Sequence, residues 1–261
     1  MMAKASGNGQ DTTASAPVLA VGLGRGSSGK STGLSEVIWR ARNQGRGVIV
    51  ADGDMRSRTL SGLFPDATRP ETEEMVDIKN WFNQLLNAMA REKTSCVLDL
   101  GGGDRALKDY GRDLRLVEFC QRRGIEPVAI YFLGPDPEDL SHIVSIWDGG
   151  YFKPARNLLI MNEGTLKGDT NPMTAFDRTM SHPDFQRIVS EGAKPIMMLR
   201  LACMDLVKGR GVGFYAAATG EGDSPLDPRS RSSRSATGWR IWSGSARPSA
   251  RSAGCPDVFS R

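Results

Sequence analysis

The stretch that decides the fold of this chain is VGLGRGSSGKSTGLSEV, residues 21–37. An apolar run ends in glycine, a loop of small residues carries a lysine, and the next segment repeats apolar residues at helical spacing. Residues 24–31 satisfy the pattern G-x-x-x-x-G-K-[ST] between a predicted strand and a predicted helix. This context predicts a phosphate-binding loop, and a flexible Gly/Ser turn is the alternative.

Each part of this loop has a physical role in holding a phosphate. Glycines let the backbone turn its N–H groups toward phosphate oxygens, and the N-terminus of the following helix adds partial positive charge. The Lys30 ammonium can reach the terminal phosphates, and the Ser31 hydroxyl is a ligand for Mg²⁺. We therefore expect a nucleotide to contact the whole loop: Gly24, Gly26, Ser27, Ser28, Gly29, Lys30, Ser31 and Thr32.

Outward from the loop, apolar strands alternate with amphipathic helices. The expected strands are residues 18–24, 47–54, 95–103, 126–134, 157–164 and 194–202. This alternation predicts an α/β fold, a doubly wound and mostly parallel sheet flanked by helices, as in Rossmann-like P-loop proteins. Ligands of such sheets bind at the carboxyl ends of the strands, which is where the motifs of this chain fall.

Carboxylates close two of the expected strands. Asp99 ends the apolar run CVLD, as a Walker B carboxylate that holds Mg²⁺ does. Asp52 and Asp54 close the second strand in the sequence ADGD. A carboxylate near a γ-phosphate can hold a water in line for attack. An Asx turn that leaves the strand is the alternative, because Asp and Gly are ordinary turn formers.

The sequence GRGSSGKST resembles the deviant Walker loop of the ParA/MinD ATPases, K-G-G-x-G-K-[ST]. The resemblance covers most of residues 18–205, and its specific part is the short motifs. It implies that Arg25 takes the place of a signature lysine that reaches the partner's nucleotide across a dimer, so that Arg25 and Lys30 are candidate catalytic residues. Arginine keeps the charge of that lysine and adds a bidentate fork. Ser27 replaces the second glycine of the family.

The same resemblance implies roles at other strand ends. Asp54 matches the carboxylate that orients the attacking water, and Asp52 would support Mg²⁺ beside Ser31 and Asp99. Glycines 101–103 resemble the mobile switch II loop, without its proline, and a purely structural turn is the alternative. Asn162 matches a strand-end asparagine that recognises the adenine edge. An asparagine in an ordinary turn is the alternative there.

Composition divides the chain into a disordered leader (1–17), a P-loop domain (18–222) and an Arg/Ser-rich tail (223–261). The tail contains ten Ser and seven Arg without helical or strand period. It carries the whole net charge of +4, because residues 1–222 are balanced. Three interpretations stay open: a disordered end, an arm that contacts phosphates, and the product of a frameshift in the coding DNA.

The four cysteines are scattered without metal-ligand spacing. The chain also has no apolar run long enough to span a membrane and no apolar core of a secretion signal. These features predict a cytoplasmic protein without disulfides.

The expected function is therefore that of a ParA/MinD-like protein that binds and hydrolyses ATP with Mg²⁺. The resemblance implies an ATP-dependent homodimer that segregates or positions a cargo such as a plasmid or a conjugation complex. It further implies stimulation by a partner protein and, in some members, nonspecific DNA binding. A P-loop phosphotransferase with Arg56, Arg58 and Arg69 in a lid is one alternative, and a nucleotide-binding adaptor without hydrolysis is another.

Overall fold

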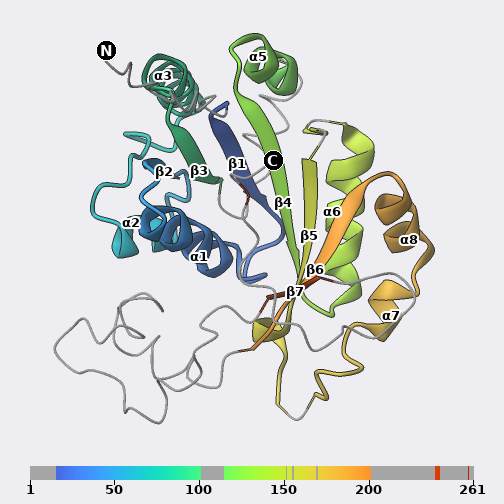
Figure 1. The fold of residues 1–261 in the computed structure, drawn as a ribbon. Helices are drawn as coiled ribbons and strands as arrows, with labels where there is room; N and C mark the ends of the chain where they lie inside the picture. Colours follow the sequence, from blue (N-terminus) through green and yellow to red (C-terminus); the bar gives the residue numbers. More distant parts are fainter. Residues whose placement is uncertain are drawn as a thin grey trace, which may run out of the picture.

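A central sheet with helices on both faces forms the body of the protein (Figure 1). The structure, a computed structural model, describes residues 16–100, 115–150, 152–154, 156–168 and 170–200, the backbone of 239–241, and residue 258. Glycines 101–103, predicted to resemble a switch loop, lie outside the described residues, as do most of the predicted leader and tail.

The strands follow one another in the sheet in the order β2-β3-β1-β4-β5-β6-β7. Neighbours from β2 to β6 pair in parallel, and β7 pairs antiparallel with β6. The predicted α/β fold with a mostly parallel sheet is confirmed. The strands are β1 (Val18–Leu23), β2 (Val48–Asp52), β3 (Ser95–Asp99), β4 (Glu126–Leu133), β5 (Arg156–Asn162), β6 (Ala193–Met198) and β7 (Trp239–Ile241).

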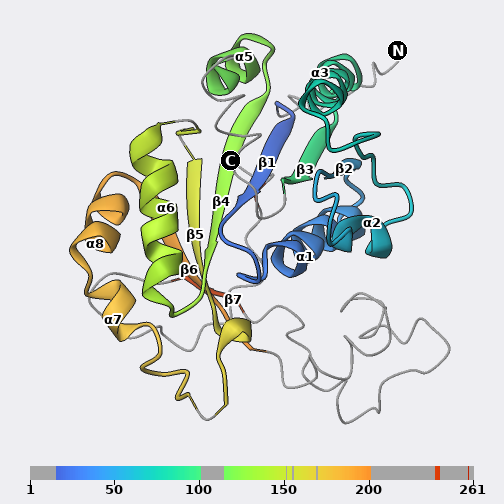
Figure 2. The ribbon, with the colours of Figure 1, turned by 180° about the vertical axis from the view of Figure 1, so that it is seen from behind.

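Alternate residues of each strand enter two separate cores, because successive side chains point to opposite faces of a sheet. In β1, Leu19 and Val21 pack in one core and Val18 and Ala20 in the other. One face carries α1 (Lys30–Asn43) and the short α2 (Thr59–Leu63), as Figures 1 and 2 show. The helices of the other core are α3 (Met75–Glu92), α5 (Leu116–Arg122), α6 (Pro137–Gly149) and α8 (Pro183–Ser190). The short α7 (Asp177–Met180) precedes α8, and η1 (Glu163–Thr165) follows β5.

The chain winds away from β1 in two directions. It runs through α1 to β2 and β3 on one side of β1, and later to β4, β5 and β6 on the other. Open α/β sheets bind ligands at such a reversal of strand order, outside the carboxyl ends of the strands. The glycine-rich loop directly follows β1 and therefore lies at this point of the fold. No helix in the described ranges combines the length and the apolar character needed to cross a bilayer.

Two described parts of the segment 223–261 contact the domain. β7 extends the sheet beside β6. Val258 is 1% exposed, belongs to the same core as the buried residues of α1, and accepts a hydrogen bond on its carbonyl from Arg156 Nη2 at 3.1 Å. The division of the chain into leader, P-loop domain and low-complexity tail stays a prediction for the remainder of that segment.

Helix α1 carries a buried acid. Glu36 is 5% exposed, and neither of its carboxyl oxygens has a hydrogen-bond partner within the described residues. Burial raises the pKa of this carboxyl to about 7, because the charged form loses hydration without compensation. The folded chain therefore binds a proton that the unfolded chain releases at a lower pH.

We predict that Glu36→Gln removes a pH dependence of folding stability. A raised folded-state pKa contributes stability that is present below the unfolded pKa of 4.5 and is lost as the pH rises through about 7. The loss is about 3 kcal/mol in the parent chain at full ionisation. Urea unfolding between about pH 5 and about pH 8 should show a smaller decline for Glu36→Gln than for the parent or for the exposed control Glu118→Gln. Equal declines in all three proteins would contradict the assignment.

Candidate functional site

The loop between β1 and α1 contains two positions, Gly24 and Gly29, at which a Cβ atom would clash with a neighbouring residue. Gly24 has φ 139°, and a Cβ built on it would lie 2.4 Å from the carbonyl oxygen of Phe132 in β4. Gly29 has φ 85°, and its Cβ would lie 2.0 Å from Asn162 Nδ2. Both positions require the left-handed backbone region and a close approach of neighbouring groups. The predicted strand–loop–helix context is present.

The middle of the loop departs from an all-glycine pattern. Ser27, at the position where the resembling family has glycine, adopts φ 64°. A non-glycine residue there costs about 1 kcal/mol of backbone strain. Gly26 and Ser27 are exposed, whereas Ser28 is 2% exposed and its Oγ has no hydrogen-bond partner in the described ranges. An unpaired buried hydroxyl in a strained loop is typical of a functional site.

The start of α1 collects hydrogen-bond donors. Within the described residues, no acceptor is bound by the backbone N–H groups of Lys30, Ser31 and Thr32, the first three of the helix. Lys30 is 5% exposed, and its Nζ donates to the carbonyl oxygens of Gly24 and Arg25, both at 3.0 Å. Orphan amides, a helix N-terminus and an ammonium group together form an anion-binding site. The loop therefore fits the phosphates of a nucleotide.

The structure joins the predicted Walker A and Walker B residues directly. Ser31 Oγ donates to Asp99 Oδ2 at 2.6 Å, although the two residues are separated by 68 positions in the sequence. Asp99 is 1% exposed at the end of β3, next to β1 in the sheet. A hydroxyl and a carboxylate are oxygen ligands of the kind that Mg²⁺ prefers, with phosphate oxygens and waters completing the shell. The pair therefore fits the predicted metal site.

Asp52 and Asp54 bind the backbone of the segment that follows β2. Asp52 is fully buried, and its two carboxylate oxygens accept from the backbone N–H groups of Asp54 at 3.1 Å and of Ser61 at 2.8 Å. Asp54 Oδ1 accepts from the N–H groups of Arg56 and Ser57, both at 3.0 Å, and Oδ2 accepts from Ser57 Oγ at 2.5 Å. These contacts are those of an Asx turn, which was the alternative to a catalytic role. It leaves the metal role of Asp52 and the water-orienting role of Asp54 as predictions.

The charge of Asp54 is nevertheless favoured by its surroundings. Burial raises the pKa of this carboxyl, but the hydrogen bonds from Ser57 and Arg56 and the nearby charge of Lys30 outweigh burial and lower the pKa below its ordinary value. The attraction to Lys30 links Asp54 to the phosphate-binding loop. Asp54 is therefore an ionised carboxylate within the field of the loop lysine.

Asn162 was predicted to recognise an adenine edge. In the structure its side chain forms hydrogen bonds with the phosphate-binding loop and with the residues that follow β5. Its Nδ2 donates to the carbonyl of Ser28 at 2.9 Å, and its Oδ1 accepts from the backbone N–H of Gly164 at 2.8 Å. The side chain is 2% exposed at the end of β5. In this arrangement Asn162 fixes the position of the phosphate-binding loop against the sheet, and base recognition stays a prediction.

Arg25 is paired with acids of its own chain. Its guanidinium lies 2.7 Å from Glu138 Oε2 and 3.3 Å from Asp139 Oδ1, in the first turn of α6. Asp139 also accepts from the backbone N–H of Gly134 at 2.8 Å, which fixes the carboxylate at the end of β4. A cross-dimer role for Arg25 therefore requires that these ion pairs be exchanged, and this role stays a prediction.

Sequence reasoning missed the acidic partners of Arg25. A signal for them was present, since PDPED places two acids in the first turn of a helix that begins at the carboxyl end of a strand. That edge of the sheet also holds the loop. In the part of the chain that the structure describes, no group of three or more His, Cys, Asp or Glu side chains is placed to hold a metal ion. The Ser31–Asp99 pair needs no such cluster, because the remaining ligands of Mg²⁺ are commonly waters and phosphate oxygens.

No protein-family model matches the chain, and no curated protein sequence is similar to it. Among solved structures, chloroplast FtsY from Physcomitrella patens is 14% identical, with a TM-score of 0.44 over 65% of this chain and 57% of that one. FlhF complexed with GMPPNP/Mg²⁺ is 15% identical, with a TM-score of 0.41 over 71% of this chain and 66% of that one.

The MinC:MinD cell division protein complex from Aquifex aeolicus contains a chain that is 12% identical, with a TM-score of 0.46 over 76% of this chain and 88% of that one. This chain spans 57% of the FtsY structure and 66% of the FlhF structure. Similarity at this level carries no information on activity, and the site rests on the geometry of the chain itself.

We predict that Asn162→Ala loosens the loop and lowers affinity for ATP and GTP to a similar extent. The variant loses the bonds to Ser28 and Gly164, and an unpaired buried carbonyl costs about 1–3 kcal/mol. Calorimetric titrations with both nucleotides, beside the exposed control Asn171→Ala, check this expectation. A loss confined to ATP would instead identify Asn162 as the residue that reads the base.

Proposed function

We propose that this protein is a Mg²⁺-dependent nucleoside triphosphatase of the ParA/MinD type, with ATP as its nucleotide. The hydrogen bond between Ser31 and Asp99 carries the proposal, because it joins a phosphate-binding loop to a buried strand-end carboxylate at 2.6 Å. These two elements together are the common machinery of P-loop NTPases. The roles proposed below for the other residues follow from their positions relative to this hydrogen bond.

Residues of the loop would bind and orient the phosphates. The free amides at the start of α1 and the turn from Gly24 to Gly29 supply donors, and Lys30 supplies a positive charge. Lys30 now donates to two backbone carbonyls, so its ammonium is already desolvated and aimed along the loop. Exchange of these neutral acceptors for phosphate oxygens would form shorter, charge-assisted hydrogen bonds.

The metal ion would lie beside Ser31 and Asp99, with Asp52 supporting the neighbouring turn. When bound, Mg²⁺ neutralises charge on the β- and γ-phosphates. Burial of Asp99 keeps competing water from its carboxylate, and the hydroxyl of Ser31 holds that carboxylate at the mouth of the loop. In this proposal Asp54 accepts a hydrogen bond from the attacking water.

Activity would be coupled to assembly. In the proposed cycle ATP closes a homodimer, Arg25 leaves Glu138 and Asp139 to reach the partner's phosphates, and hydrolysis reopens the dimer. Such a cycle would position a cargo such as a plasmid or a conjugation complex, with a partner protein and DNA as further components.

A nucleotide-binding adaptor without hydrolysis is the second candidate. One observation favours it: both carboxylate oxygens of Asp54 are already bonded to Arg56 and Ser57 in a turn. If the turn is the whole role of Asp54, the site binds nucleotide and lacks a residue that orients water.

We predict that Lys30→Ala lowers affinity for Mg-ATP by about tenfold to a hundredfold. The change removes a buried charge-assisted donor, and such a bond contributes about 1.5–3 kcal/mol. Calorimetric titration with Mg-ATP provides the measurement, and Lys167→Ala, at an exposed position, is the control. Unchanged affinity in Lys30→Ala would place the nucleotide at another site, and absence of binding in the parent would overturn the proposal.

We predict that Asp54→Ala retains Mg-ATP binding and ATP-dependent dimerisation but loses turnover by at least about tenfold. ADP release and molecular mass in the presence of ATP are the two measurements. Ser57→Ala is the matched control, because it weakens the same turn and keeps the carboxylate. Equal turnover in Asp54→Ala and the parent would remove Asp54 from catalysis. Absence of turnover in the parent, with binding intact, would establish the adaptor.

A further inference from the structure

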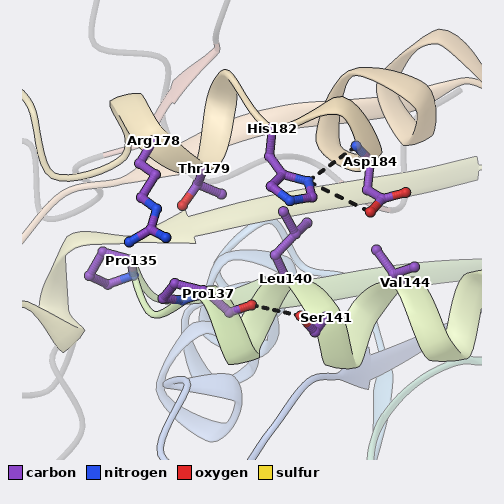
Figure 3. Close-up of a pocket in the computed structure, with 9 residues that line it drawn as sticks. All are labelled: Pro135, Pro137, Leu140, Ser141, Val144, Arg178, Thr179, His182 and Asp184. Carbon is purple, nitrogen blue, oxygen red and sulfur yellow. Dashed lines mark hydrogen bonds and ion pairs between the residues drawn. The ribbon is translucent and has the colours of Figure 1, made fainter.

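A cavity of about 200 Å³ lies on the side of the sheet opposite to α1, between α6 and the segment that contains α7 and the start of α8 (Figure 3). Its walls are Pro135, Pro137, Leu140, Ser141, Val144, Arg178, Thr179, His182 and Asp184. Glu138 and Asp139, the partners of Arg25, share the first turn of α6 but do not line this cavity. The cavity is therefore separate from the phosphate-binding loop.

One side of the cavity is apolar. Pro137, Leu140 and Val144 follow one face of α6 at helical spacing, and Pro135 precedes them in the connection between β4 and α6. Leu140 is 4% exposed, so its side chain forms part of a wall that is continuous with the core. This wall suits a short hydrocarbon group.

The opposite side offers hydrogen-bond donors. Figure 3 shows the Arg178 guanidinium extending toward Pro135 and Pro137. Arg178 forms no ion pair or hydrogen bond with any residue in the described ranges. Thr179 is 5% exposed, and its hydroxyl likewise makes no hydrogen bond in the part of the chain that the structure describes. The exposed Arg178 guanidinium and the neighbouring Thr179 hydroxyl are donors that a ligand anion can use.

His182 adds a third donor. It is the N-cap of α8, and its Nδ1 accepts from the backbone N–H of Asp184 at 3.2 Å. The same Nδ1 lies 3.6 Å from Asp184 Oδ2, so Nε2 is the ring nitrogen that does not face Asp184. Figure 3 shows this ring next to Leu140 in the cavity. The one carboxylate of the lining, Asp184, is compensated by Arg187, whose Nη2 lies 3.2 Å from its Oδ1.

Size limits the ligand. The cavity of about 200 Å³ has room for a small molecule of several heavy atoms. Pockets for drug-sized ligands begin at about 300 Å³, so a nucleotide does not fit. Apolar walls and converging donors together select a small molecule with a hydrocarbon tail and a negatively charged head.

We propose that this cavity binds a small monocarboxylic acid with a short branched or linear hydrocarbon tail. The carboxylate lies against Arg178, Thr179 and His182, and the tail lies against Leu140 and Val144. This site is independent of the proposed nucleotide hydrolysis. It shares α6 with the acids that hold Arg25.

Isovalerate, with about seven heavy atoms, is the probe, and the isosteric neutral isovaleramide is its partner compound. Titrations followed by the methyl NMR signals of Leu140 and Val144 should give a dissociation constant on the order of 1 mM for the acid. The amide should bind about tenfold more weakly, and acetate, which lacks the tail, should also bind more weakly. Equal binding of acid and amide would overturn the proposal.

Variants locate the binding. Arg178→Gln should weaken isovalerate binding about tenfold, and the control Arg91→Gln, at an exposed position of α3, should leave it unchanged. Ser141→Leu, which fills the cavity from an exposed position, should abolish it. Lys30→Ala should bind isovalerate as the parent does. Binding that is lost in Lys30→Ala and kept in Arg178→Gln would assign the acid to the phosphate-binding loop and overturn the proposal.

Discussion

The hydrogen bond from Ser31 to Asp99 ties the first turn of α1 to the sheet, and the arrangement of the site depends on it. Parallel pairing of β1 with β3 sets Gly22 opposite Asp99, so the start of the loop and the carboxylate emerge at one edge. A carboxylate that is 1% exposed must be compensated, because burying an unpaired charge is costly. Ser31 supplies part of that compensation, and it can do so only if α1 begins at Lys30. The hydrogen bond therefore requires the turn at Gly29, the backbone of the loop and the orientation of the helix.

The cations of the loop are satisfied by oxygens of their own chain. Lys30 donates to two loop carbonyls, and Arg25 pairs with two acids of α6. A phosphate that binds to Lys30 or Arg25 must therefore replace an internal oxygen that already accepts a hydrogen bond from that side chain. Its affinity is set by the difference between phosphate and these internal acceptors. The first turn of α6 thus belongs to the electrostatics of the loop, although it lies 114 positions from Arg25 in the sequence.

The strands and the loop could be predicted from the sequence, because their causes are local. Apolar runs of strand length mark buried parallel strands, and Gly24 and Gly29 stand where the backbone needs positive φ. The six predicted parallel strands are present, and each ends one to four residues before its predicted carboxyl end. The contact of Asn162 with Ser28 was not predictable, since it joins residues 134 positions apart. The partners of Arg25, up to 114 positions away, were missed although PDPED signalled acids at this edge of the sheet. Local sequence also left two roles open for Asp54, because a turn and a catalytic site use the same Asp-Gly chemistry.

β7 pairs with β6 and so becomes the edge strand on that side of the sheet. Without it, β6 would present a row of unpaired backbone amides and carbonyls beside the apolar side chains of Ile196 and Met198. Open borders of this kind recruit strands from other molecules and lead to aggregation. β7 covers the last three residues of β6 with antiparallel pairing, in which Ile241 lies opposite Ile196. The edge of the sheet thereby passes to a three-residue strand, and very short edge strands are one of the features by which proteins limit edge-to-edge aggregation.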